Sequence, residues 1–452
     1  MTGIGRWILL LGVPLLLWPA LYNGYPLVFA DTGTYLDQAL RGYAGWDRPP
    51  AYSAAILPLH LSLTTWPVIV VQALLTAHLL WLARSVLVPG AGQAGLAGVF
   101  ALLGLGTIAP WIIAQLLPDL FTPLLVLSLV LLALVPERLG WSGRLWCMAI
   151  ATVAIAVHYS HLPLALGLLI CLLVLRRLRQ PAPRLGIGGL ARLVLPILLA
   201  VAGWVSVNSA AHDRAALSPF GGVFLLARVI HDGPGLDYLR RACPAAGYRL
   251  CPYLDAIHGT SDTFLWDKDS ALNRAGGPKP VAEEAMRIVT AAVAEEPWRQ
   301  ARASLRNALA QFLQYRSGDG LEPWPDDPGP RATLTAHFPP REVAAYLAAR
   351  QAQGELGLIE TLSPLHVTVE TIGMLLCLVL AIVLRRDPAG QFCAAVLLAL
   401  VGNAILAGAL SSVHPRYQAR LVWLAVFAAW VAAERWRILR DGRRAGGAAG
   451  QD

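Results

Sequence analysis

Ten stretches of apolar residues constrain this chain more than any other feature of its sequence. A helix needs about 20 such residues to cross a lipid bilayer. The 452 residues are 56% hydrophobic and only 14% charged, whereas about a quarter of the residues of soluble domains are charged. We therefore expect an all-α polytopic membrane protein with about ten transmembrane helices, at residues 7–22, 66–88, 92–108, 111–135, 145–157, 162–178, 190–209, 364–384, 391–410 and 417–433.

One long hydrophilic segment, residues 210–363, interrupts this series. It carries 16 basic and 18 acidic residues, and the rest of the chain carries 20 basic and 10 acidic ones. Helical spacing of its apolar residues favours a mainly helical insert. We thus expect a transmembrane part at 1–209 with a long loop at 23–50, the insert at 210–363, further transmembrane helices at 364–434, and a basic tail at 435–452.

Arginine clusters predict the orientation of the chain, because cytoplasmic loops of membrane proteins are rich in arginine and lysine. These clusters are Arg176, Arg177, Arg179, Arg184 and Arg192, the pair Arg385 and Arg386, and the tail. Placing them in the cytoplasm puts both termini there and the insert on the extracytoplasmic side of a cytoplasmic (inner) membrane. No basic patch with interleaved aromatic residues occurs, so a nucleic-acid partner is not expected.

The loop at 23–50 contains the first candidate catalytic residue. Asp31 stands beside the predicted membrane surface and could accept a proton from an acceptor hydroxyl as a general base. Capping of the helix that follows is the alternative role. Asp37 and Arg48 are candidates for substrate binding, although Arg48 could equally form a simple ion pair with the neighbouring Asp47.

A second carboxylate, Asp119, lies inside a predicted membrane helix directly after Pro118. Charged groups at such positions are costly and are usually functional or paired, so Asp119 is the second catalytic candidate. The alternative is that Asp119 starts the spanning part just after Pro118, at the boundary with water. His158 and His161 interrupt another apolar stretch and are candidates for substrate binding, and hydrogen bonding across a helix break is the alternative role. Two histidines do not make a metal site, so we expect no cofactor, although a divalent metal remains open.

The start of the last predicted helix carries His414, Arg416 and Arg420. Arg416 and Arg420 are one turn apart and face the same way, and the planar guanidinium group suits phosphate. Anchoring in the membrane interface is the alternative. The orientation predicted above places this turn, the 158–161 break and the 23–50 loop on the same, extracytoplasmic side. On that side Cys243 and Cys251 could also form a disulfide.

These residues resemble the membrane-embedded GT-C glycosyltransferases, which include protein O-mannosyltransferases and lipid A aminoarabinose transferases. The resemblance rests on the acid in PLVFADTGTYL, on the following RPPAYSAAILPLH, on the LPD at Asp119, and on a large insert before the last helices. It covers most of residues 1–210. The acidic pair often seen in such loops is not adjacent here.

The resemblance implies transfer of a sugar from a polyprenyl-phosphate donor to a glycan, lipid or protein acceptor on the extracytoplasmic face, with membrane lipid as the other partner. A transporter or flippase of a lipid-linked glycan is the first alternative, and it predicts polar residues through the membrane depth. A non-catalytic subunit of an envelope assembly is the second alternative.

Overall fold

The computed structural model describes residues 3–178, 186–324 and 329–448, and side chains over most of these ranges. The described part of the chain is all-helical, and its one β-bridge joins Leu27 to Gln115. Four helices there are long and apolar enough to cross a membrane: α4 (Trp66–Leu87), α10 (Ile187–His212), α19 (Gly357–Val383) and α20 (Pro388–Leu410). Their length and composition are those of a membrane protein.

The other predicted spans also fall on helices, most of them shorter. They are α1 (Gly3–Asn23), α5 (Gln93–Gly106), α7 (Phe121–Leu134), α8 (Trp141–Ala156), α9 (His161–Arg177) and α21 (Pro415–Ala448). Every residue of α7 is buried, as expected for a helix that is apolar on all sides. We call these six helices and the four long ones together the helix pack, and α7 lies near its centre. The number of helices that cross the membrane stays a prediction.

One predicted span, 111–135, is divided in the structure. The short helix α6 (Ala109–Ile113) ends before a non-helical stretch at 114–117, and a 3-10 turn, η1 (Pro118–Leu120), leads into α7. Leu117 is extended, because the ring of a following proline disfavours helical backbone. The stretch pairs with the loop at 23–50, which we call the first loop. Leu27 N donates to Ala114 O (3.0 Å), and Leu116 N donates to Leu27 O (2.9 Å).

The loop at 23–50 contains one helix, α2 (Ala30–Arg41), and is followed by α3 (Ala51–His60). The Thr32 hydroxyl accepts from Phe29 N (2.9 Å) and donates to Leu116 O (3.2 Å). This hydroxyl caps α2 and ties its first turn to the stretch that precedes Asp119. The two predicted acids therefore sit on neighbouring pieces of backbone.

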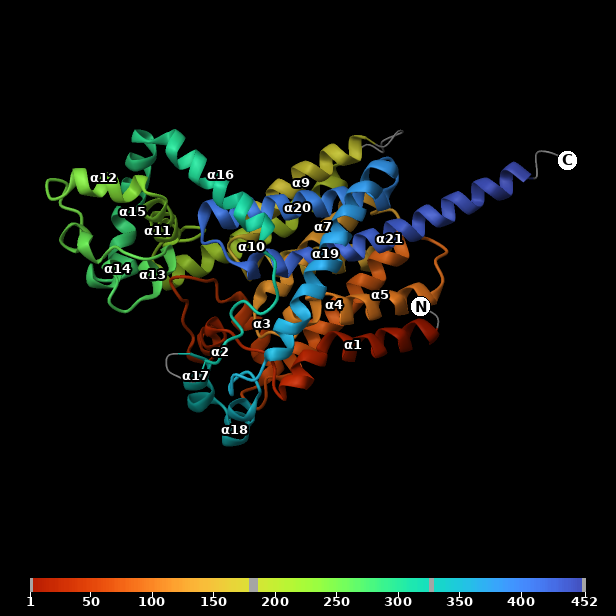
Figure 1. Ribbon diagram of the computed structural model, residues 1–452, viewed down its shortest axis with the longest axis horizontal. Helices are drawn as coiled ribbons and strands as arrows, with labels where there is room; N and C mark the ends of the chain where they lie inside the picture. Colours follow the sequence, from red (N-terminus) through yellow and green to blue (C-terminus); the bar gives the residue numbers. More distant parts are fainter. Residues whose placement is uncertain (1–2, 179–185, 325–328, 449–452) are drawn as a thin grey trace.

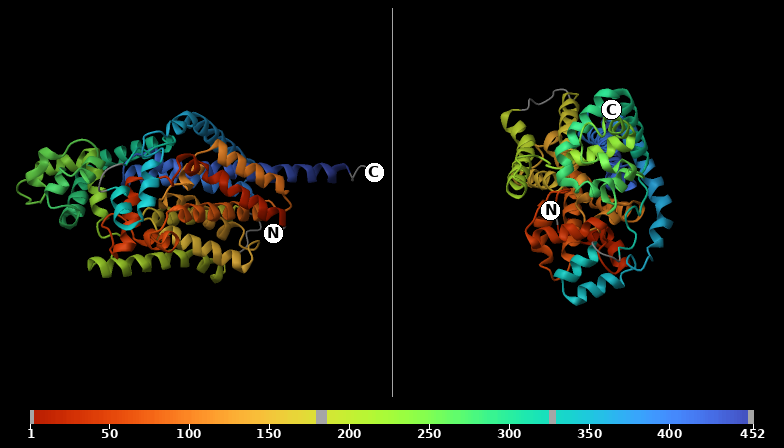
Figure 2. Two further views of the ribbon diagram at one scale, coloured as in Figure 1. Left: turned by 90° about the horizontal axis from the view of Figure 1, so that it is seen from below. Right: turned by 90° about the vertical axis from the view of Figure 1, so that its left-hand side faces the viewer.

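The first part of the insert forms a separate hydrophobic core, and we call it the cap. Its elements are α11 (Gly221–Asp232), α12 (Pro234–Ala242), η2 (Cys251–Ala256), α13 (Ser261–Trp266), α14 (Ala271–Arg274) and α15 (Pro278–Glu295). The cap lies at one end of the long axis, and both chain termini lie toward the other end (Figures 1 and 2).

The remainder of the insert packs on the helix pack instead. It comprises α16 (Pro297–Leu313), α17 (Pro330–His337) and α18 (Pro340–Ala348). α16 runs along α20, and α17 packs on α2. Glu342 accepts from the Tyr25 hydroxyl and from Thr65 N, both at 2.8 Å, so this part of the insert holds the first loop in place.

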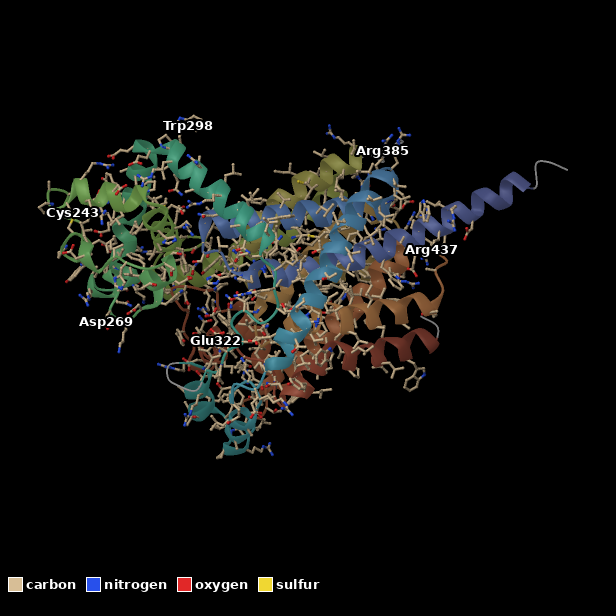
Figure 3. All side chains as sticks on the ribbon, in the orientation of Figure 1. Cys243, Asp269, Trp298, Glu322, Arg385 and Arg437 are labelled. Carbon is tan, nitrogen blue, oxygen red and sulfur yellow. A yellow bond between two sulfur atoms is a disulfide. The ribbon has the colours of Figure 1, made fainter. Side chains whose placement is uncertain are left out.

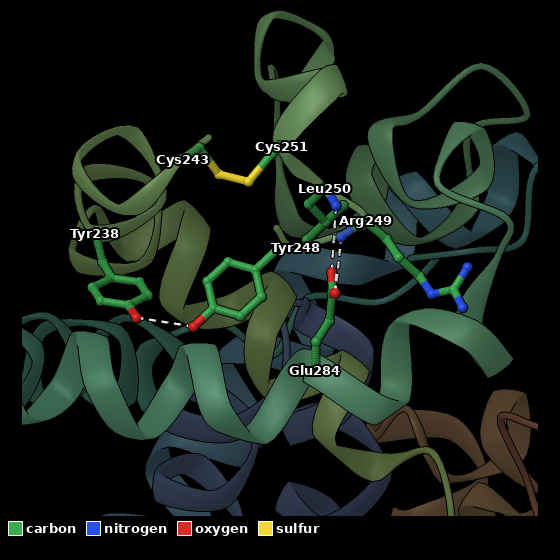
Figure 4. The surroundings of a disulfide bond; sticks show 7 residues. All are labelled: Tyr238, Cys243, Tyr248, Arg249, Leu250, Cys251 and Glu284. Carbon is green, nitrogen blue, oxygen red and sulfur yellow. Dashed lines mark hydrogen bonds between the residues drawn. A yellow bond between two sulfur atoms is a disulfide. The ribbon is translucent and has the colours of Figure 1, made fainter. Parts of the chain in front are cut away.

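Cys243 lies at the outer end of the cap (Figure 3) and forms a disulfide with Cys251 (Figure 4). Beside it, the buried Glu284 accepts from Arg249 N (2.9 Å) and Leu250 N (3.3 Å). The disulfide and this carboxylate hold the same short segment, residues 243–251, which has little regular structure of its own.

Candidate active site between the cap and the helix pack

Asp31 lies in the first turn of α2, where negative charge suits the helix N-terminus. The N-cap is Phe29, and the capping hydroxyl comes from Thr32, so Asp31 is free of that structural role. Its side chain is 30% exposed, and Oδ1 lies 3.0 Å from Arg48 Nη1. The other carboxylate oxygen has no partner among the described residues.

Arg48 bridges two carboxylates at the edge of the site. Its Nε and Nη2 donate to Asp47 Oδ2, and its guanidinium lies over the Tyr35 ring, 5.2 Å from the centroid. Burial opposes the charged form, but Asp31 and Asp47 raise the pKa of Arg48 above its usual range. Burial also raises the pKa of Tyr35. Tyr35 therefore stays protonated.

Asp119 is buried and is held by two arginines of the first turns of α21, Arg416 and Arg420. Arg420 Nη1 donates to Asp119 Oδ1 (2.7 Å), and Arg416 Nε lies 3.8 Å from Oδ2. Arg420 also donates to Asn403 Oδ1 (3.0 Å). A buried charge is tolerated when it is paired and hydrogen-bonded. Asp119 thus orients Arg420 and Arg416 and offsets one of their two positive charges.

The position of Arg416 is set by its own backbone and by an aromatic ring. Its N–H donates to Asp319 Oδ2 (3.0 Å), and its guanidinium stacks 3.8 Å above the centroid of Phe29. Phe29 belongs to the first loop and directly precedes α2. The same stretch of chain therefore carries Asp31 and supports Arg416.

His158 lies in the break between α8 and α9, where the sequence predicts one. Its Nδ1 is 2.8 Å from the Ser160 hydroxyl and accepts from Ser160 N (3.2 Å), which leaves Nε2 available. His161 stacks on it at 5.0 Å. The His161 ring is fully buried, with Nε2 2.7 Å from the Thr122 hydroxyl, so His161 supports His158 from behind.

These groups meet at one cavity of about 350 Å³, within the range of small-molecule sites. Asp31, Arg48, His158, Arg416 and Arg420 all line it. Asp119 is not among the lining residues and lies behind the two arginines. One wall is apolar and comes from α20, with Leu406, Ala407 and Leu410.

Aromatic residues of the cap close the cavity on the side away from the helix pack. Phe224 and Trp266 line it, and both pack against Trp46 of the first loop, with centroid distances of 5.3 and 5.5 Å. The cap is therefore part of the cavity wall, and its attachment controls the shape of the site.

Three predicted substrate-binding residues do not line the cavity: His161 lies behind His158, and the other two lie elsewhere. Asp37 faces α17 and pairs with His337 (3.0 Å) and Arg41 (3.4 Å). His414 lies outside the cavity lining and pairs with Asp262 of the cap, Nε2 to Oδ2 at 2.9 Å. Asp37 and His414 thus join the insert to the helix pack.

The lining also includes Tyr35, Asn403 and Phe224, which are not among the predicted site residues. Tyr35 follows Asp31 by four residues, a spacing that puts both on one face of α2. Asn403 is a polar residue inside an apolar helix, which is itself a signal of function. Phe224 carries no comparable sequence signal.

In the described ranges, no group of three or more histidine, cysteine, aspartate or glutamate side chains could hold a metal ion. No family model, curated protein or solved structure matches the chain.

Proposed function

We propose that this protein is a membrane glycosyltransferase. It moves a sugar from a polyprenyl-phosphate donor to an acceptor on the extracytoplasmic face of the cytoplasmic membrane, as the resemblance to GT-C enzymes implies. One observation carries the proposal: a partly exposed carboxylate, Asp31, and three arginines, Arg48, Arg416 and Arg420, line the same cavity. Asp31 and Arg48 come from the N-terminal part of the chain, and Arg416 and Arg420 come from the C-terminal part.

The arginines are suited to the donor's phosphate. Guanidinium groups that are fixed before the reaction stabilise negative charge as it develops on a leaving phosphate. Arg420 is fixed by Asp119 and Asn403, and Arg416 by Phe29 and Asp319. The apolar wall of α20 gives the first isoprene units of the donor a surface next to these cations.

Asp31 is suited to the acceptor. The acceptor oxygen forms a bond to the anomeric carbon of the sugar, and the bond between that carbon and the phosphate oxygen breaks. The acceptor's proton passes to Asp31, and both electrons of the broken bond leave with the polyprenyl phosphate. In this scheme Asp119 is a positioning residue and does not touch the substrate.

The orientation of the chain is part of the proposal. Both termini lie toward the end of the molecule opposite the cap (Figure 2), and the tail of α21 carries the arginines expected in the cytoplasm. The disulfide of the cap suits an oxidising, extracytoplasmic compartment. The cavity lies at the cap end, where a lipid headgroup and the acceptor could meet.

The test is a transfer assay in proteoliposomes with labelled polyprenyl-phosphate sugars, read as release of polyprenyl phosphate and labelling of an acceptor fraction. We expect Asp31→Asn to lower turnover about 10²- to 10⁴-fold, the usual contribution of general acid–base catalysis. Asp269→Asn, which removes an exposed carboxylate of the cap (Figure 3), is the matched control and should leave turnover unchanged.

Other outcomes separate the alternative functions. Full turnover by Asp31→Asn would show that Asp31 is not the base. Movement of intact donor across the bilayer without a covalent product would favour a flippase. Rescue of a deletion strain by alanine at Asp31, Asp119 and Arg416 together would favour a non-catalytic subunit.

A further inference from the structure

The helix α16 has its polar and apolar faces reversed relative to a helix on the surface of a soluble domain. Its buried side is polar and includes Gln300, Asn307 and Gln311. Gln300 and Asn307 donate to Asp232 of the cap (2.7 and 2.9 Å). Gln311 donates to His414 O (2.8 Å) and accepts from His414 N (2.9 Å).

The outward side of α16 is apolar. Trp298, Leu305, Leu309 and Leu313 are 86, 72, 60 and 65% exposed. With 3.6 residues per turn they fall within an arc of about 80°, so they form one stripe along the helix, which we call the α16 stripe. A surface helix in water normally turns such a stripe inward. The reversal indicates that the medium outside α16 is not water.

The neighbouring helix shows what that medium is. α20 is one of the four helices that are long and apolar enough to cross a membrane, and its Val401 and Ile405 are exposed. The two helices touch closely: a Cβ added at Gly408 would lie 2.6 Å from Ala308 N. α16 descends from the cap beside the cap-side end of α20 (Figure 1), with Trp298 pointing outward at its upper end (Figure 3).

Two arginines complete the pattern. Arg302 lies within the arc of the stripe and Arg306 lies at its edge, and both are exposed. Neither makes an ion pair within the described part of the chain. Leucine and tryptophan beside unpaired arginine are typical of helices that lie in the membrane interface, where long cationic side chains reach the lipid phosphates.

We infer that α16 is an interfacial helix, whose stripe lies in the acyl chains next to the headgroups and whose Arg302 and Arg306 contact anionic lipid phosphates. This inference is independent of the proposed function. The bilayer then holds α16 from outside while Asp232 and His414 hold it from inside. The cap, which closes the cavity, is thereby fixed at a set height above the membrane.

The test is nitroxide labelling of single cysteines in the full chain, reconstituted in vesicles of phosphatidylcholine and phosphatidylglycerol, with the half-exposed Cys171 replaced by alanine. Labels at Leu305→Cys and Leu309→Cys are compared with two references. Ile382→Cys is on the exposed side of the spanning helix α19, and Ala294→Cys is on the exposed side of α15 in the cap. The readout is collision with oxygen, which concentrates in lipid, against collision with a water-soluble nickel chelate.

We expect the labels at 305 and 309 to match residue 382, with high oxygen and low nickel accessibility. Accessibility like that of residue 294 would place the stripe in water and overturn the inference. Low accessibility to both reagents would mean that another protein surface covers the stripe, and would overturn it equally. A small substitution on an exposed face leaves the inward contacts of α16 intact, so each outcome can be read on folded protein.

Discussion

Asp31 and Asp119 look alike in the sequence, since each is an acid at the edge of an apolar segment, yet the structure gives them opposite surroundings. The Asp31 side chain is 30% exposed, lines the cavity and lies against one arginine. The Asp119 side chain is 7% exposed, lies behind the cavity wall and contacts two arginines. An acid in a membrane segment can thus serve its neighbours rather than the substrate.

The difference has a physical origin. Taking an ion out of water costs several kcal/mol, and only close pairing offsets this. Asp119 meets that condition because both of its oxygens face cations. Asp31 retains an oxygen without a partner in the described structure, so it can accept a proton from a bound molecule. We expect the two positions to respond differently to the same substitution.

The largest expected effect is on stability. Asp119→Asn leaves Arg416 and Arg420 buried without a counter-charge, and breaking a buried pair typically costs about 3–5 kcal/mol. Thermal unfolding in detergent should show a clear loss for Asp119→Asn and a much smaller one for Asp31→Asn. Adding Arg420→Gln to Asp119→Asn should restore part of the loss. Wild-type stability of Asp119→Asn would contradict the structural role.

The next effect is on transfer. Arg48→Lys cannot contact Asp31 and Asp47 together, because lysine lacks the planar fork of arginine. Without the ion pair between Arg48 and Asp31 the base is less well positioned, and a misplacement of about 1 Å can cost about 10²-fold in rate, so we expect turnover to fall roughly tenfold to a hundredfold in the transfer assay. Unchanged turnover would mean that Asp31 is positioned by α2 alone.

The helices were within reach of sequence reasoning, because apolar periodicity is a local property. All-helical architecture is confirmed in the described ranges. The interruption of 111–135 was harder to see, since Pro118 can also begin a helix. The interruption accompanies the backbone pairing of Leu27 with Ala114 and Leu116. No local sequence pattern encodes that contact.

The site could be anticipated in part. Asp31, Arg48, His158, Arg416 and Arg420 share a polar character that stands out in an apolar chain, and all of them line the cavity. The sequence could not separate lining residues from residues behind the wall, because burial of Asp119 depends on partners some 300 positions away. The same limit applies to His414, whose partner is a carboxylate of the cap.

The smallest expected effect concerns this tie between His414 and the cap. Ser412 donates to Asp262 Oδ1 (2.9 Å), and His414 Nε2 meets Oδ2, while Asp319 lies 3.9 Å from Nδ1. The hydrogen bond with Asp262 raises the pKa of His414, although burial and the nearby Arg416 oppose this. Burial opposes ionisation of Asp262, but His414 lowers its pKa overall.

The signs of these shifts set the pH window. A raised pKa in the folded state means that the contribution of His414 is complete below its unfolded pKa, near 6.5, and is lost as the pH rises through the folded value. The contribution of Asp262 is present above its own unfolded pKa and is lost as the pH falls through its lowered value.

Amide exchange in α13, corrected for intrinsic rates, should show weaker protection at pH 8.5 than at pH 6. His414→Gln should abolish this difference, and His258→Gln, an exposed histidine of the cap, should retain it. Equal pH dependence in both variants would assign the effect to another group.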